Sequence, residues 1–470
     1  MRIILDINLG KLAKWLRILG YDAEIAENIL LLNRDPEEGD LYIVKCRKSR
    51  DALIEKGRNS VFIPFDSIET QIMYLVSEGI IERTQTELQR CPVCNKMTEP
   101  VEKGTIKDKV APFVYKNNTE FRICNGCGRV YWNATHTAAM REKIGRYFKD
   151  RPLSNLGVTA GDMNGCGPQI LLKLYTERKD IFREKRIFII GSIEVLEYYK
   201  RLYAKHSRKL EKCVFKAVKD TAAYDPSVIN VIDVKLRKSE KFSPGSPSAS
   251  AGSHTMRILE QSVSRFYSRE IDIIINLPNS KESLNMAGHD LSGATEFYSK
   301  AGGDPVMTFF SEDMVLALLT RHLPVSGVPS AVKGELILRT LEVLKPYGTI
   351  GVLGLNPHAS ESGLLGDEEA KIIEPALAEA RSRGINVRGP LIPDAFFKTP
   401  CDVYLSMYHD QALPLFKYLY LDRSCQATLG IPVRRVSVSH GTAWDRVADY
   451  SAETSSLKFI LEKGLKKIRW

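Results

Sequence analysis

The chain has 470 residues, enough for about two to four domains of ordinary size, so a single small binding module is excluded. Apolar residues make up 44% of it and charged residues 26%, which excludes wholly disordered, collagenous and coiled-coil chains. Lys and Arg outnumber Asp and Glu by 67 to 57, a mild excess that suits an anionic partner. No apolar run approaches the roughly 18 residues of a membrane span, and the N-terminus has no signal-peptide pattern, so we expect a cytoplasmic protein that contacts no membrane.

The first 85 residues predict a small α/β domain. The run RIILD at 2–6 is a short apolar strand, and residues 9–19 repeat Leu and Trp at helical spacing. The opposite face of that helix is either a contact surface for RNA phosphates or an ordinary solvated helix face. Its basic residues are Lys11, Lys14 and Arg17. The next predicted elements are strands at 41–45 and 61–64 and a helix at 68–79.

Four of the nine cysteines form two CxxC pairs in a segment from about 88 to 135. A CxxC turn places two sulfurs on one side of a zinc ion, and two such turns complete a tetrahedral site. In a cytosolic chain such pairs indicate metal ligands before disulfides. Four thiolates fill the tetrahedral coordination of zinc and leave no position for a substrate or water, so we expect a structural rather than a catalytic zinc. Its predicted ligands are Cys91, Cys94, Cys124 and Cys127.

These segments resemble a known family. The run LDINLGKLAKWLRILGYDA at 5–23 and the cysteine-rich run that begins RCPVCNKMTEP at 90 are similar to the PIN-type ribonuclease-like domain of the mut-seven carboxy-terminal family, with its zinc ribbon. The resemblance implies a PIN-like α/β fold and zinc ribbon over residues 1–150. It also implies an RNA partner for this part of the chain.

The same resemblance implies clustered carboxylates that bind divalent cations and activate water for nuclease chemistry. Asp6 matches the first of these positions, and Asp35 and Asp66 are candidates for the others. Where the family has Thr-Arg-Asp after the second strand, this chain has Cys46-Arg47-Lys48. A basic residue opposes cation binding, so we expect a degenerate nuclease site.

A second α/β pattern begins at about residue 151 and continues to the C-terminus, which predicts a larger domain over 151–470. The Ser-, Pro- and Gly-rich segment 241–254 has this pattern on both sides, so we interpret it as a surface loop within one domain. The predicted strands include RIFIIG, VINVIDV, DIIINLP, TIGVLGL and VYLSMYH.

Three histidines stand at predicted strand-to-loop junctions, namely His322, His358 and His409. In an open α/β sheet such junctions meet at the crevice where ligands bind. Three neutral imidazoles can hold a divalent metal and leave a position open for a substrate oxygen, although each alone could be a structural hydrogen-bonding residue. Lys417 and Arg435 are candidates to bind a phosphate or carboxylate, or are ordinary surface charges.

The motifs around these residues resemble the 4-hydroxythreonine-4-phosphate dehydrogenase family of pyridoxine biosynthesis. They are GLNPHASESGLLGDEEAKIIEPAL, MYHDQALPLFK and SHGTAWD, with TAGDMNGCGPQILLK and INLPNSKESLNMAGHDLSGATEF before them. The resemblance implies an isocitrate/isopropylmalate dehydrogenase-like α/β/α fold with a central cleft and a homodimer. It further implies NAD or NADP, a divalent metal such as Zn, Mg or Co, and a small phosphorylated hydroxy acid as substrate.

The resemblance also assigns roles to residues. Its metal ligands are His322, His358 and His409, at a dimer interface. Its substrate-binding positions are Thr295, Lys417, Gln426 and Arg435. Its cofactor-binding positions are Asn356, His440, Gly441, Thr442 and Ala443, and the candidate catalytic residues are Asp410 and Lys281.

Several positions depart from the family pattern. The Gly-His-Thr-Glu motif is Gly293-Ala294-Thr295-Glu296 here, which removes an imidazole from the substrate pocket. The usual asparagine after the lysine is Gln426, and the aspartate before the HGTA motif is Ser439. These changes favour an altered phosphorylated substrate or reduced activity.

The sequence therefore predicts a metal- and NAD-dependent dehydrogenase fused to a PIN-like, zinc-ribbon domain. The reaction expected is oxidation and decarboxylation of a phosphorylated hydroxy acid such as 4-phosphooxy-L-threonine, or a related phospho-threonate. The alternative is an RNA-binding or RNA-processing protein that retains a drifted dehydrogenase-like scaffold.

Overall fold

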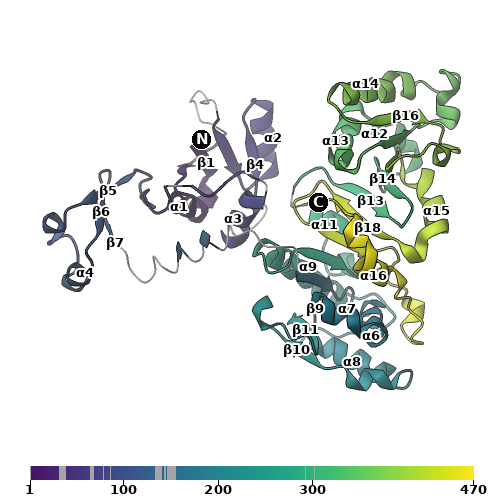
Figure 1. The fold of residues 1–470 in the computed structure, drawn as a ribbon, viewed down its shortest axis with the longest axis horizontal. Coiled ribbons are helices and arrows are strands. Elements are labelled where there is room, and N and C mark those ends of the chain that lie inside the picture. The colour runs from purple at the N-terminus through teal and green to yellow at the C-terminus, as the bar shows by residue number, and fades with distance from the viewer. Residues whose placement is uncertain are drawn as a thin grey trace. The chain divides into compact units, whose positions relative to one another are not determined.

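The chain divides into two compact units in the computed structural model (Figure 1). One comprises residues 1–152 with 267–269, and the other comprises 153–266 with 270–470. The structure describes all residues except 1, 31–38, 64–67, 78, 85, 133–139, 142–143, 146–154, 292 and 301, and only the backbone of 47, 69, 70 and 77.

The N-terminal unit contains a parallel four-stranded sheet in the order β2-β1-β3-β4. Strand β1 has three consecutive buried apolar residues, so it occupies the centre of the sheet, and helix α1 packs its Leu and Ala residues inward. The predicted strand–helix beginning is confirmed. The elements are β1 (Arg2–Asp6), α1 (Gly10–Ile18), β2 (Asp22–Ala26), β3 (Leu41–Val44), α2 (Arg47–Glu55), β4 (Ser60–Phe62) and α3 (Ile68–Ser77).

A separate three-stranded antiparallel sheet, β5-β6-β7, follows in the same unit. It is formed by β5 (Thr98–Val101), β6 (Phe121–Cys124) and β7 (Val130–Trp132), and the segment between the CxxC pairs also contains the short helix α4 (Pro112–Asn117). Between the two CxxC pairs the chain forms β5, a 3-10 turn and α4 before β6. The sequence also predicts a helix at about 137–149, and most of that range lies outside the described residues.

The C-terminal unit contains one twelve-stranded mixed sheet with the order β10-β11-β9-β8-β12-β19-β18-β13-β14-β17-β15-β16. The pairs from β10 to β19 are parallel, as are those from β14 to β16, while β18 and β13 join the two halves through antiparallel pairs. Helices lie against the sheet in both halves (Figure 1). The predicted α/β architecture of this unit is confirmed.

The strands of this unit are β8 (Asn155–Thr159), β9 (Arg186–Gly191), β10 (Phe215–Ala217), β11 (Ile229–Asp233), β12 (Ile273–Asn276), β13 (Val306–Phe310), β14 (Val315–Leu318), β15 (Ile350–Leu353), β16 (Val387–Leu391), β17 (Val403–Ser406), β18 (Cys425–Leu429) and β19 (Arg435–Val438). The five predicted apolar runs contain β9, β11, β12, β15 and β17. Most residues of these strands are buried, as expected of a sheet that helices cover on both faces.

The longest helix corrects one expectation. Helix α9 begins at residue 249, so the segment 241–254 is a loop only up to residue 248 and then the start of a nineteen-residue helix. Ser248 precedes this helix and its Oγ accepts a hydrogen bond from Ala251 N at 3.1 Å, an N-terminal capping role that serine favours. The helices are α6 (Gly167–Glu177), α7 (Lys179–Glu184), α8 (Ile193–Tyr203), α9 (Ala249–Tyr267), α10 (Lys281–Met286), α11 (Ala294–Ser299), α12 (Val328–Ala331), α13 (Gly334–Leu344), α14 (Glu374–Ser382), α15 (His409–Tyr420), α16 (Ser455–Phe459) and α17 (Leu465–Lys467).

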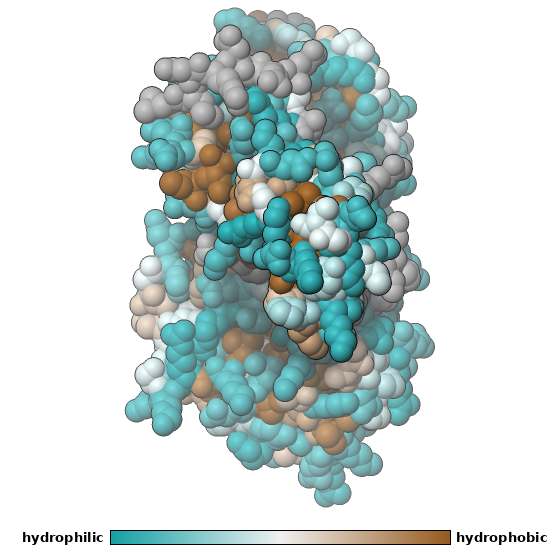
Figure 2. All heavy atoms as spheres, turned by 90° about the vertical axis from the view of Figure 1, so that its left-hand side faces the viewer, coloured by the Kyte–Doolittle hydropathy of each residue, from teal (hydrophilic) through white to brown (hydrophobic). Residues whose placement is uncertain are grey.

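The molecular face drawn in Figure 2 is predominantly hydrophilic, with apolar atoms in separate groups. Among the described residues no helix has both the length and the apolar character needed to cross a membrane.

Candidate active site and metal centre

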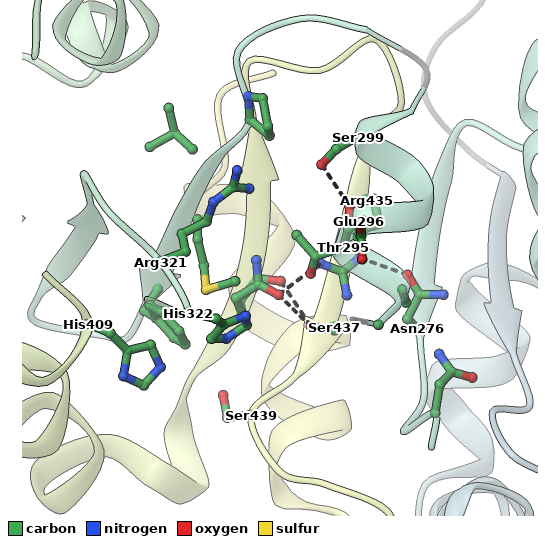
Figure 3. Close-up of a pocket in the computed structure, with 18 of the residues that line it drawn as sticks. Asn276, Thr295, Glu296, Ser299, Arg321, His322, His409, Arg435, Ser437 and Ser439 are labelled. Atoms are coloured by element: carbon green, nitrogen blue, oxygen red, sulfur yellow. Dashed lines mark hydrogen bonds between the residues drawn. The ribbon is translucent and has the colours of Figure 1, made fainter. Parts of the chain in front are cut away.

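A pocket of about 860 Å³ lies at the middle of the large sheet, where its two halves meet. Strands β12, β18, β19 and β13 and the loop after β14 contribute to its wall, together with helices α11 and α15 (Figure 3). Nine of the predicted site residues line it. They are Lys281, Thr295, His322, His409, Lys417, Gln426, Arg435, His440 and Gly441.

Arg435 is the centre of a buried polar cluster on one side of this pocket. It is 3% exposed, and Nε donates to Asn276 Oδ1 at 2.9 Å. Nη1 donates to Thr295 Oγ1 at 3.0 Å and to Gln426 Oε1 at 2.8 Å. Burial lowers the pKa of Arg435 to about 10, which leaves the guanidinium charged at neutral pH. Its Nη2 donates to none of the described residues.

The partners of Arg435 are themselves held in place. Gln426 Oε1 also accepts a hydrogen bond from Ser437 Oγ at 3.0 Å, across the antiparallel pair β18–β19. Asn276 Nδ2 donates to Tyr298 OH and Thr159 Oγ1, both at 3.0 Å. A network with this many fixed members holds a charged donor rigidly, as an anion-binding site requires.

Two of the three predicted metal-ligating histidines lie together. The ring centroids of His322 and His409 are 5.5 Å apart, and His409 Nδ1 lies 2.7 Å from Asp410 Oδ1. Burial lowers the pKa of His322, and the charge of Lys281 lowers it further. A neutral imidazole has a free lone pair, so His322 is in the form that binds a metal.

His358 lies apart from this pair. It follows β15, while His322 follows β14 and His409 follows β17, so all three succeed neighbouring parallel strands as predicted. The side chain of His358 is nevertheless 58% exposed, lies 4.0 Å from Glu361 and does not line the pocket. Residues 358–362 all have positive φ, a backbone conformation that side chains other than glycine rarely adopt.

Two further predicted residues, Asp410 and Asn356, also lie outside the pocket lining. Asp410 is exposed and is positioned to orient His409 through its carboxylate. Asn356 does not line the pocket, and its amide donates to Glu368 Oε2 at 2.8 Å and to Glu369 Oε2 at 2.9 Å, which shapes the loop before His358.

The loop His440–Ala443, predicted to approach the cofactor, lies at the pocket rim. The backbone N–H of Cys166, which precedes α6, donates to Thr442 O at 3.0 Å. His440 and Gly441 line the pocket, whereas Thr442 and Ala443 do not. Burial lowers the pKa of His440, and its Nε2 is buried without a hydrogen-bond partner. An unsatisfied nitrogen at this rim fits a site that receives a polar cofactor.

Arg321 is a pocket residue that the sequence analysis missed. It stands next to His322 and lines the pocket on the side away from Thr295 and Arg435 (Figure 3). Its place in the run LLTRHLP, beside a candidate metal ligand, was the signal that could have identified it. Asn276 and Ser437 were missed as well, because only the strand pairing brings them to the polar cluster around Arg435.

The four predicted zinc ligands form a separate centre in the N-terminal unit. The sulfurs of Cys91, Cys94, Cys124 and Cys127 all lie within 4.8 Å of one another. Burial opposes ionisation of Cys91, but hydrogen bonds from the Cys94 backbone and the Tyr131 hydroxyl outweigh it and lower the pKa to about 6. Four soft sulfur ligands at this spacing fit zinc and leave no open position.

Arg17 was predicted to lie on a solvated or RNA-contacting helix face, and this is wrong. It is 8% exposed, and Nη1 donates to Pro92 O at 3.1 Å and Val93 O at 2.9 Å within the first CxxC turn. Helix α1 therefore anchors the ribbon through a buried guanidinium, a long-range contact that helical periodicity does not reveal. Of the three basic residues predicted to lie on the exposed face of this helix, only Lys11 and Lys14 are exposed.

Of the three candidate nuclease carboxylates only Asp6 can be assessed, because Asp35 and Asp66 lie outside the described residues. Asp6 Oδ1 accepts from Asn8 N and from Asn8 Nδ2, each at 3.2 Å, so it caps the turn after β1.

Comparison with known proteins identifies both parts. The sequence model described as "Pyridoxal phosphate biosynthetic protein PdxA" matches residues 183–462. The chain belongs to the PdxA family. The model described as "Mut7-C RNAse domain" matches residues 1–144, so a Mut7-C domain precedes the PdxA part, as the resemblances implied.

Several proteins named as dehydrogenases are similar to the PdxA part of the chain. A 4-hydroxythreonine-4-phosphate dehydrogenase of Aquifex aeolicus is 38% identical over 316 residues, covering 64% of this chain and 94% of the relative. A D-threonate 4-phosphate dehydrogenase of Cupriavidus necator is 33% identical over 325 residues, covering 66% and 96%. The crystal structure of a 4-hydroxythreonine-4-phosphate dehydrogenase from Klebsiella pneumoniae matches with a TM-score of 0.58 and 27% identity, covering 67% of this chain and 99% of that one.

Proposed function

We propose that the chain oxidises a phosphorylated hydroxy acid with NAD or NADP and that the resulting β-keto acid loses carbon dioxide. The observation that carries this proposal is the buried Arg435–Thr295–Gln426 cluster in the same pocket as His322 and His409. The names of the relatives from Aquifex aeolicus and Cupriavidus necator support it.

The phosphate of the substrate binds at the Arg435 cluster in this proposal. Arg435 Nη2 and the ammonium group of Lys417 make no hydrogen bond or ion pair with any described residue, so both can donate to a ligand. The hydroxyl of Thr295 offers a further donor. Guanidinium and ammonium groups on a rigid network favour a dianion held at fixed distance from the histidines.

The carboxylate and hydroxyl of the substrate then lie at the histidine side of the pocket. His322 and His409 would hold a divalent metal, which polarises these groups, and NAD would accept the hydride. The third ligand would be His358 of a second copy of the chain, because His358 of the same copy lies outside the pocket. This arrangement requires a homodimer.

One residue is assigned to proton transfer and another to the orientation of the His409 ring. Lys281 lines the pocket, and its ammonium group makes no hydrogen bond or ion pair with a described residue, so it is the group we assign to proton transfer at the substrate. Asp410 acts on His409 instead, because its carboxylate lies 2.7 Å from His409 Nδ1 and fixes the ring. The loop at His440 and Gly441 receives the cofactor.

The test is product formation by the purified chain with NAD, a divalent metal and 4-phosphooxy-L-threonine, D-threonate 4-phosphate or an erythronate 4-phosphate. The proposal expects NADH and carbon dioxide in equal amounts from at least one of these acids. NADH without carbon dioxide would contradict the decarboxylation, and no NADH from any of them would contradict the whole proposal.

A second function rests on the Mut7-C match over residues 1–144. We infer that this unit binds RNA, held in shape by its zinc ribbon. The test is RNA binding by the full-length chain: salt-dependent binding that is lost on replacing Lys11 and Lys14 would support this inference, and no RNA binding would contradict it. RNA binding together with failure to bind NAD would favour the alternative of an RNA-binding protein with a drifted dehydrogenase scaffold.

A further inference from the structure

Arg321 is a pocket cation to which neither the family resemblance nor the proposed function gives a role. It follows β14, directly before His322, and it lines the central pocket. It makes no hydrogen bond or ion pair with any residue that the structure describes. Figure 3 shows its side chain on the side of the pocket opposite Thr295 and Arg435.

The surroundings of Arg321 explain why its charge matters. Burial disfavours its charged form, and the carboxylate of Glu296 is the group whose charge counteracts this. A half-buried guanidinium without a hydrogen-bonding partner is costly, and a ligand that supplies an anionic oxygen removes that cost. Arg321 is therefore suited to bind a ligand rather than to hold the fold together.

The pocket also has a small residue at a position where the family motif has a larger one. Ala294, which is 8% exposed, lines the same pocket at the start of α11, in the position where the family motif has histidine. The pocket thus lacks one titratable imidazole and contains one permanent guanidinium.

More positively than negatively charged side chains line the pocket. Its cations are Lys281, Arg321, Lys417 and Arg435, and its anions are Glu296 and Asp304. Asp304 already lies 3.6 Å from Arg339, outside the pocket lining. The remaining positive charge attracts a substrate with several negative charges, and it repels a positive group carried by the substrate itself.

We propose that Arg321 is a substrate-binding residue that makes this pocket prefer a phosphorylated acid with a neutral hydroxyl next to its carboxylate over one with an ammonium group there. The proposal rests on the proposed function, which places the carboxylate end of the substrate beside His322. The favoured class is the aldonate 4-phosphates, and the disfavoured class is the phosphorylated amino acids.

Two ligands separate these classes. D-threonate 4-phosphate and 4-phosphooxy-L-threonine share the phosphate and the carboxylate, but the first carries a hydroxyl and the second an ammonium group beside the carboxylate. Calorimetric titration of the full-length chain gives the Kd of each ligand, and NADH formation gives kcat/KM for each. We expect the wild-type chain to bind D-threonate 4-phosphate at least about tenfold more tightly, the usual scale for one charged hydrogen bond.

Arg321→Met should weaken D-threonate 4-phosphate binding by about 10- to 100-fold and abolish the preference, while Arg321→Lys should retain most of it. Arg201→Met removes an exposed charge of α8 outside the pocket and should change neither Kd. An unchanged ratio of the two Kd values in Arg321→Met, with or without a lower melting temperature, would overturn the proposal, because a merely structural arginine acts on both ligands alike.

The proposed reaction and the proposed role of Arg321 can be contradicted separately. Binding with the expected preference but without NADH would contradict the proposed reaction and leave the role of Arg321 standing. NADH formation with an unchanged ratio in Arg321→Met would contradict only the role of Arg321. Failure of the wild-type chain to bind either ligand would contradict both.

Discussion

The buried guanidinium of Arg435 donates to the hydroxyl of Thr295 at 3.0 Å, although the two residues are 140 positions apart in the chain. Thr295 lies in the first turn of a short helix, α11, and Arg435 begins the central strand β19. Their contact joins two elements at the middle of the large sheet and fixes a permanent positive charge at the wall of the pocket.

Replacing Arg435 by lysine should therefore lower kcat/KM for a phosphorylated substrate by about 100-fold or more. An ammonium group cannot make the hydrogen bonds from Nε and Nη1 together and also reach the ligand. Steady-state kinetics with NAD and the phosphorylated acid measures the effect. Arg201→Lys on the surface of α8 is the control, and activity of Arg435→Lys within about threefold of the wild type would contradict the assignment.

A metal site shared between two copies of the chain predicts complementation. His358→Ala and His409→Ala should each abolish activity, because each removes a ligand from every site of a homodimer. Mixing the two variants under conditions that exchange subunits should restore about a quarter of the activity, since mixed dimers regain one intact site. Activity measured before and after exchange tests this, and no recovery would exclude the shared site.

The buried carboxylate of Asp162 should make stability depend on pH. Burial raises its pKa from 3.8 to about 6 even though the Asn164 N–H donates to it at 2.8 Å. An acid with a raised pKa stabilises the folded state fully below the unfolded value of 3.8 and loses this contribution as the pH rises through about 6. The shift in this buried group corresponds to about 3 kcal/mol.

Asp162→Asn should therefore gain stability relative to the wild type on going from pH 4 to pH 8, by up to about 3 kcal/mol, as measured by urea unfolding. Asp225→Asn is the control, because hydrogen bonds from Ser227 lower the pKa of Asp225 and the pH trend should not have this sign. A stability difference for Asp162→Asn that stays constant with pH would contradict the account.

Loss of the proposed zinc centre should destabilise the ribbon and leave the proposed dehydrogenase reaction unchanged. Cys124→Ser breaks the four-sulfur centre, so amide hydrogen exchange in residues 91–131 should accelerate by at least about tenfold, as expected when a metal contributes to folding. Cys425→Ser, a buried cysteine of the other unit, should leave that exchange unaffected. Unchanged exchange in Cys124→Ser would rule out a structural metal there.

Much of the fold could be predicted from sequence, because apolar strands and CxxC turns are local patterns. RIFIIG is strand β9 in full, and the four cysteines converge as their spacing indicated. Local patterns could not predict contacts between side chains that are far apart in the sequence. Arg17 was placed on a polar helix face but is buried against the first CxxC turn.

The candidate site shows the same limit. His322 and His409 lie together, but His358 does not join them in one chain, because the loop after β15 leaves its side chain 58% exposed and outside the pocket. Arg321 went unnoticed because a single arginine has no motif of its own. Its importance depends on which charges face it, and only the folded structure determines that.

The measurement that tests the central claim most directly is absorbance at 340 nm after mixing the purified chain, NAD and a divalent metal with each phosphorylated acid and with the same acid lacking its phosphate. The account predicts NADH formation that requires the phosphate and disappears in His409→Ala. NADH formation that is equal with and without the phosphate, or absent with every phosphorylated acid tried, would contradict it.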